Sequence, residues 1–96
     1  MDHHSVQFSC LDGSLTEDLP GAIDTLAREL RDAAEATGSG RAPISARAAY
    51  LRAQAAHSRA VAEWTVASGQ HQLRAVSAAL AECRCALAAT RAKPEE

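Results

Sequence analysis

The chain has 96 residues, a net charge of −2 and an apolar fraction of 47%, much of it alanine. A chain of this length corresponds to one domain. No stretch approaches the roughly 20 apolar residues that span a bilayer, and no basic start is followed by an apolar run, so we predict neither a membrane span nor a signal peptide. Large apolar side chains are few, and small domains bury proportionally little surface. We therefore expect a protein partner, either a second copy or another subunit.

The first residues differ in pattern from the rest. Residues 1–13 alternate apolar and polar side chains up to a turn dipeptide, Asp12-Gly13, and we interpret them as a flexible or short extended segment. A strand added to a partner's sheet is the alternative for this segment. Residues 14–93 are predicted to form a helical hairpin domain, and residues 94–96 a tail.

The first helix is predicted to begin within Ser14–Asp18 and to end near Thr37. Ser14 opens a capping box, and Pro20 is tolerated only in a first turn. A glycine-rich stretch, Gly38–Gly40, ends the helix. Apolar residues recur in it at spacings of three and four, which predicts one buried stripe. The stripe consists of Ile23, Leu26, Leu30 and Ala33.

A long alanine-rich segment follows, from Ile44 to Lys93, free of proline and interrupted by one glycine, Gly69. Pro43 precedes it at a position that favours a helix start. Helix propensity summed over this length predicts a long second helix. The hydrophobic phase slips near Gly69, so this helix is either kinked there or broken into two, near 43–68 and 70–92. We predict the single continuous or kinked helix.

The apolar residues of the last third keep a clean heptad. A hairpin that turns at Gly38–Gly40 lays the first helix beside only the first half of the second, which leaves this seam uncovered. The predicted fold is therefore all-α: a hairpin with a short and a long arm that forms a coiled coil or four-helix bundle with a partner. Two aromatic residues are predicted to anchor the contact. The candidate partner-binding residues are Tyr50, Trp64, Val66, Leu73, Val76, Leu80, Cys83 and Leu87.

Charge is distributed unevenly along the chain. Residues 1–40 hold eight acidic residues and two arginines, a net −6, whereas residues 41–96 hold eight basic and four acidic residues, a net +4. The opposite net charges of the two halves fit a first helix that folds back on the second. The arginines form no dense stripe and no aromatic residues interleave them, so we do not expect a nucleic acid partner.

Patterns for catalysis and metal binding are weak. Arg52 and His57 have the Arg-x4-His spacing that resembles HEPN-type ribonucleases, but an offset of five residues turns the two side chains apart on one helix. The histidines and cysteines lack the spacings of zinc sites. We therefore predict no enzyme activity, no metal and no cofactor.

The three cysteines, Cys10, Cys83 and Cys85, are an odd number. Cys83 and Cys85 are close neighbours on a predicted helix and point in different directions, which does not suit a disulfide between them. Free thiols fit a reducing compartment, so we predict a cytoplasmic location.

The size, the predicted hairpin and the alanine-rich composition resemble the WXG100/ESAT-6-like proteins of type VII secretion. That family carries a Trp-x-Gly motif at its hairpin turn, whereas four residues separate Trp64 from Gly69 here, and Gly38–Gly40 contains no tryptophan. The resemblance implies a secreted helical-hairpin protein, which is the alternative function. The first hypothesis is a small non-enzymatic adaptor or scaffold subunit that assembles through the coiled-coil seam.

Overall fold

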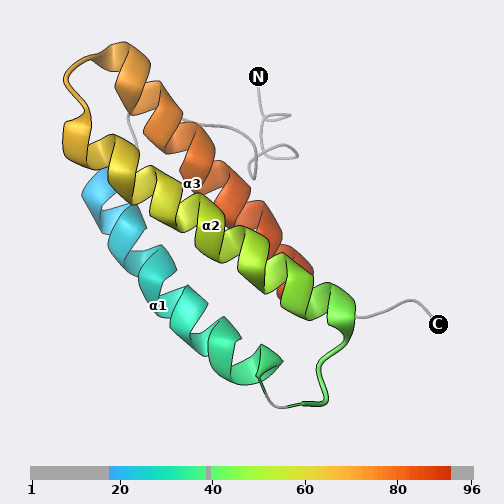
Figure 1. The fold of residues 1–96 in the computed structure, drawn as a ribbon. Helices are drawn as coiled ribbons and strands as arrows, with labels where there is room; N and C mark the ends of the chain where they lie inside the picture. Colours follow the sequence, from blue (N-terminus) through green and yellow to red (C-terminus); the bar gives the residue numbers. More distant parts are fainter. Residues whose placement is uncertain (1–17, 39, 92–96) are drawn as a thin grey trace, which may run out of the picture.

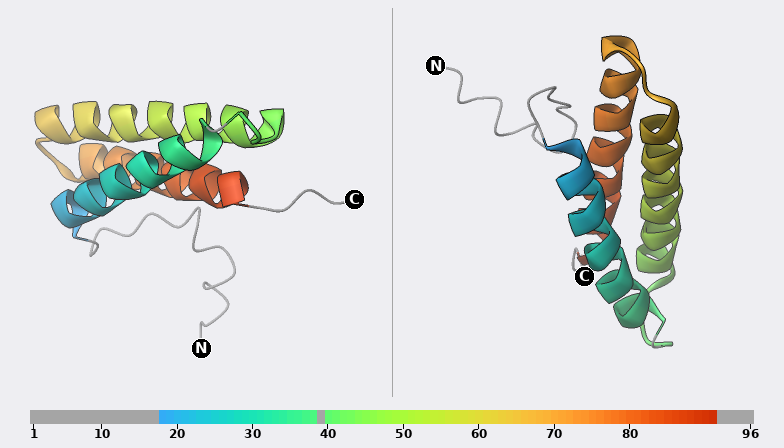
Figure 2. Two further views of the ribbon diagram at one scale, coloured as in Figure 1. Left: turned by 90° about the horizontal axis from the view of Figure 1, so that it is seen from below. Right: turned by 90° about the vertical axis from the view of Figure 1, so that its left-hand side faces the viewer.

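The structure, a computed structural model, describes residues 18–38 and 40–91. Within these ranges it contains three helices and no strand: α1 (Leu19–Thr37), α2 (Ile44–Val66) and α3 (Gln70–Arg91). Figures 1 and 2 show α2 and α3 as an antiparallel hairpin, with α1 lying across both. The all-α prediction is confirmed. The segments predicted for residues 1–13 and 94–96 lie outside the described residues.

The long second arm is two helices rather than one. The prediction of a continuous or kinked helix is wrong, because α2 ends at Val66 and α3 begins at Gln70. These helix ends lie close to those of the alternative prediction, two separate helices near 43–68 and 70–92. The chain also reverses direction between them, so α3 packs back along α2 (Figure 1). The second half of the predicted arm is therefore covered by the chain itself.

The turn between α2 and α3 is held by local hydrogen bonds. The backbone N–H and the hydroxyl of Ser68 both donate to Oε1 of Gln72, at 2.8 and 2.9 Å. The N–H of Leu73 donates to the carbonyl of Gly69 at 3.0 Å, which is the first turn of α3. The side chain of Gln72 in the first turn of α3 thus reaches back to Ser68 ahead of the helix, a contact of the capping-box type that favours a helix start at this place.

α1 begins one turn later than the predicted capping box. Asp18 is its N-cap, and the Oδ1 atom accepts a hydrogen bond from the N–H of Gly21 at 3.2 Å. A Cβ on Gly21 would lie 2.2 Å from Oδ2 of Asp18, so the glycine leaves room for the cap. Pro20 lies in the first turn and the helix ends at Thr37, both as predicted. Ser14, the predicted start of the capping box, lies outside the described residues.

The connection from α1 to α2 lies where the glycines predicted it. Gly40 has a φ of 88°, in the left-handed region that favours glycine. Pro43 is the N-cap of α2 rather than its first residue. One turn into α2, a guanidinium nitrogen of Arg47 donates to the carbonyl of Ala42 at 3.3 Å. The connection thus returns the chain antiparallel to α1.

The three helices contribute different side chains to one core. α1 supplies mainly leucines, α3 supplies Val76, Leu80 and Leu87 together with smaller residues, and every fully buried residue of α2 is an alanine. Because alanine extends so little from the backbone, small residues allow helices to approach closely. We call these residues of α2 the inner alanine stripe: Ala46, Ala49, Ala53, Ala56 and Ala60.

Ion pairs connect α3 to both other helices. Arg91 of α3 lies 3.6 Å from Glu29 of α1, and Arg59 of α2 pairs with Glu82 of α3. All four side chains are substantially exposed to solvent. Such surface pairs typically contribute about 0–1 kcal/mol, so they favour the observed register more than they determine stability.

Candidate protein-interaction surface

Most of the predicted coiled-coil seam lies inside the molecule. Val76, Leu80 and Cys83 have an exposed fraction of 0% and Leu87 of 1%, and all four belong to the core shared by the three helices. Leu73 is partly buried against the same core. Because α3 folds back on α2, the heptad that predicted an intermolecular seam is used for packing within the chain.

The other three predicted residues lie nearer the surface. Tyr50 is partly buried and packs against the core, whereas the exposed fractions of Trp64 and Val66 are 38% and 62%. Trp64 lines a hollow of about 600 Å³ at the α2–α3 turn, together with Gly69 and Leu73. Trp64 and Val66 thus stay available to a partner.

α2 exposes several large apolar side chains, whereas the residues that it buries are all alanines. Ile44 is 80% exposed and Leu51 is 60% exposed, whereas the inner alanine stripe is at most 5% exposed. The exposed apolar residues recur at helical spacing on the side opposite this stripe. We call them the outer face of α2: Ile44, Ala48, Leu51, Ala55, Ala62 and Val66.

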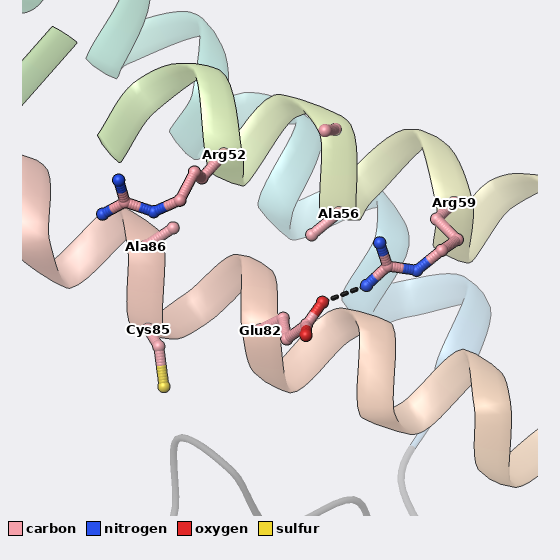
Figure 3. A pocket seen from close by; sticks show the side chains of 7 residues that line it. Arg52, Ala56, Arg59, Glu82, Cys85 and Ala86 are labelled. Carbon is pink, nitrogen blue, oxygen red and sulfur yellow. Dashed lines mark hydrogen bonds and ion pairs between the residues drawn. The ribbon is translucent and has the colours of Figure 1, made fainter. Parts of the chain in front are cut away.

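A basic groove borders the outer face on the side of α3. It has a volume of about 410 Å³ and is lined by Arg52, Arg59, Glu82, Cys85 and three alanines. Figure 3 shows both arginine side chains reaching from α2 toward α3, where Arg59 meets the carboxylate of Glu82. The groove therefore has an apolar floor between charged walls.

Arg52 and His57 do not come together. Arg52 lines the groove between α2 and α3, whereas His57 lines a hollow between α1 and α2. Nε2 of His57 lies 3.0 Å from the carbonyl oxygen of Ile23, a distance at which the ring nitrogen donates a hydrogen bond to α1. The arrangement gives these two residues no common space for a phosphate.

The two cysteines of α3 differ in state. Cys83 is a free, buried thiol, and burial raises its pKa to about 11. Cys85 is disulfide-bonded, so the prediction of three free thiols is wrong for this residue. Cys10 lies outside the described residues. The inference of a reducing compartment from free thiols loses its support at Cys85, because disulfides persist mainly in oxidising compartments.

The described residues also bear on metal binding and on membrane crossing. In residues 18–38 and 40–91, no group of three or more His, Cys, Asp or Glu side chains is arranged to hold a metal ion. In the same part of the chain, no helix combines the length and apolarity that crossing a bilayer requires.

Comparison with known proteins gives no relative from which a function transfers. No family model, curated protein or solved structure matches the chain. The outer face of α2 and the groove beside it are the features of the described residues that bear on function.

Proposed function

We propose that this protein is a small non-enzymatic adaptor or scaffold subunit that assembles with another protein through helix-to-helix contact. One observation carries the proposal: α2 turns Ile44, Leu51 and Val66 to solvent while it buries only alanines. Contiguous exposed apolar residues on a helix mark interaction sites, because water solvates them poorly. The proposed contact surface is the outer face of α2. Trp64 lies at the α2–α3 turn, on the side of the helix that carries the inner alanine stripe, and is a separate exposed residue near the end of this surface.

This proposal moves the contact from α3 to α2. The sequence pattern placed the partner on Leu73, Val76, Leu80, Cys83 and Leu87, which pack inside the chain. Trp64 and Val66 remain proposed partner-binding residues, and Tyr50 is proposed as a separate contact in the first half of α2, where it packs on the core. An exposed tryptophan beside aliphatic residues is a common composition for an energetic centre of an interface.

Site-specific photo-crosslinking in the organism of origin tests the proposal. A photoreactive amino acid replaces Leu51, on the outer face of α2, or Arg31, an exposed residue of α1 that serves as the matched control. We expect a discrete protein adduct from position 51 and none from position 31. Adducts at neither position, or the same adducts at both, would contradict the proposed function.

A secreted helical-hairpin protein of the WXG100/ESAT-6-like kind is a second candidate. Two observations favour it: the α2–α3 turn brings Trp64 and Gly69 to the same end of a hairpin, and Cys85 is disulfide-bonded. The cytoplasm remains the proposed location for the adaptor, so location separates the two candidates. Detecting the protein in culture supernatant with an intact disulfide would favour secretion, whereas a purely cytoplasmic, reduced protein would exclude it.

A further inference from the structure

We propose that the occupant of the outer face of α2 is an amphipathic helix of a different protein that carries acidic side chains along the edges of its apolar stripe. The inference rests on the proposed function and adds the chemistry of the partner. Its three supports are the shape of the outer face, the charge along its edges and the repulsion that two copies of this chain would meet there.

The outer face alternates large and small side chains. Ala48, Ala55 and Ala62 are spaced seven positions apart, Leu51 lies between the first two, and Ile44 lies one turn before Ala48 on the same face. All five are exposed. In packed helices, a large side chain of one helix inserts between residues of the other, and small residues provide the space for it. The outer face therefore suits a partner helix with leucine-sized residues at heptad spacing.

Arginines lie on both edges of the outer face. Arg52 and Arg59 lie on the edge next to α3, where both line the groove, and helical spacing places Arg47 on the opposite edge. Arg59 already pairs with Glu82. Arg52 makes no ion pair with any residue in the described ranges, and Arg47 contacts a backbone carbonyl. Within the part of the chain that the structure describes, these two cations thus have no carboxylate partner, and an acidic partner would supply one.

The groove shows how one partner side chain would fit. Ala55, Ala56 and Ala86 give it an apolar floor, and the guanidinium groups of Arg52 and Arg59 stand on its walls. A glutamate can lay its methylene groups on such a floor and present its carboxylate to a guanidinium. Arginine binds carboxylates through two parallel N–H donors, which favours an acid over a neutral side chain here.

A second copy of this chain fits the same surface poorly. Two identical helices that pack antiparallel over the full length of the outer face bring the same edge of each together, so Arg52 of one copy would meet Arg59 of the other. Parallel packing would bring the edge of Arg52 against the edge of Arg47. Glu63, the one acid of α2, lies on the edge of Arg59, but antiparallel packing brings it near the uncharged Ser45. Like charges held together disfavour both pairings.

Peptide binding by the full chain tests the acidic partner. The probes are two labelled helical peptides of about three heptads, both with leucine at the a and d positions, one with glutamate and one with lysine at the e and g positions. Fluorescence anisotropy at low salt measures their affinities. We expect the glutamate peptide to bind at least about tenfold more tightly, with the preference decreasing as salt screens the charges.

Two matched variants locate the effect. Arg52→Glu should weaken the glutamate peptide about tenfold, whereas Arg31→Glu, the same change of charge on the exposed side of α1, should leave its affinity within about twofold. Leu51→Glu should weaken both peptides. Equal affinities for the two peptides, no binding of the glutamate peptide, or equal effects of the two arginine variants would overturn the inference.

Light scattering of the full chain separates this inference from the proposed function. We expect a monomer at every concentration. A dimer that Leu51→Glu dissociates would make a second copy the occupant, which overturns the acidic partner and leaves assembly through the outer face intact. Failure of the crosslinking at position 51 would instead remove the proposed function itself.

Discussion

Leu80 and Leu51 are chemically identical and occupy opposite environments in this fold. Leu80 is 0% exposed at the centre of the three-helix core, and Leu51 is 60% exposed on the outer face of α2. Removing a buried leucine loses its transfer free energy and leaves a cavity, whereas removing an exposed one does neither. The burial of each leucine therefore decides how much it contributes to stability, and the exposed Leu51 is the one that the proposed function assigns to recognition.

Substitution of the two leucines by alanine should separate these roles. Leu80→Ala is expected to lower the free energy of unfolding by about 2–5 kcal/mol, because the cavity is enclosed by all three helices. Leu51→Ala should change it by less than about 0.5 kcal/mol. Urea unfolding followed by circular dichroism measures both values. A small loss for Leu80→Ala would mean that α3 does not pack back on the other helices.

Cys83 should make stability depend on pH in the alkaline range. Burial raises the pKa of its thiol from 9.0 to about 11 in the folded chain, so the unfolded chain ionises first as pH rises. The unfolded state then binds fewer protons than the folded state, and the free energy of unfolding falls between about pH 9 and 11. The contribution is fully present below pH 9.

The variant Cys83→Ala supplies the control for this pH dependence. Tyrosine and lysine ionisation act on both proteins, so the difference between their unfolding curves isolates the thiol. We expect the slope of stability against pH to be shallower in the variant above pH 9. Identical slopes would show that the thiol is not shielded from water in the fold.

At the scale of an element, α2 has two apolar sides with different residues. The inner alanine stripe faces the core, and the outer face carries Ile44 and Leu51. The sequence pattern predicts α1 beside the first half of the long arm, but it gives no sign that alanines form the buried set of α2. Both sides of α2 contain alanines, so the pattern of apolar and polar residues does not show which side is buried. Packing against a neighbouring helix decides that.

Enlarging one alanine on each side of α2 should test this assignment. Ala60 is 0% exposed, and Ala60→Leu should lower the free energy of unfolding by about 1–3 kcal/mol because the close packing has no room for a larger side chain. Ala62 is exposed, and Ala62→Leu should be nearly neutral. Thermal unfolding compares the two variants. Similar melting temperatures would contradict the alanine-lined core.

The break between α2 and α3 left a weaker signal in the sequence than the break between α1 and α2. Gly38 and Gly40 stand beside Pro43, whereas Gly69 is the one helix-breaking residue in its neighbourhood. A single glycine costs a helix about 1 kcal/mol, which a long alanine-rich helix can absorb. The additional stabilisation comes from Ser68 and Gln72, whose hydrogen bonds start the new helix. The four-residue spacing of Ser68 and Gln72 is the local sequence signal for this helix start, and the prediction above did not use it.

At the scale of the whole molecule, the helical content was predictable and the arrangement was not. The stripe of Leu26 and Leu30 and the heptad of Leu80 and Leu87 were both identified as apolar faces, and both are buried. The turn at Ala67–Gly69 decides which apolar faces cover each other. Because the chain reverses there, the apolar face of α3 packs against the other helices of the same molecule. The candidate interaction surface followed only from that reversal, since it exposes the outer face of α2.

The two apolar sides of α2 share no residue, and this separation has an evolutionary consequence. Selection on Ile44, Leu51 or Arg52 acts on exposed positions, while the alanines that hold α2 to the bundle lie across the helix. Substitutions that retune affinity can therefore accumulate without eroding foldability. A lineage could exchange one binding target for another while the scaffold stays constant.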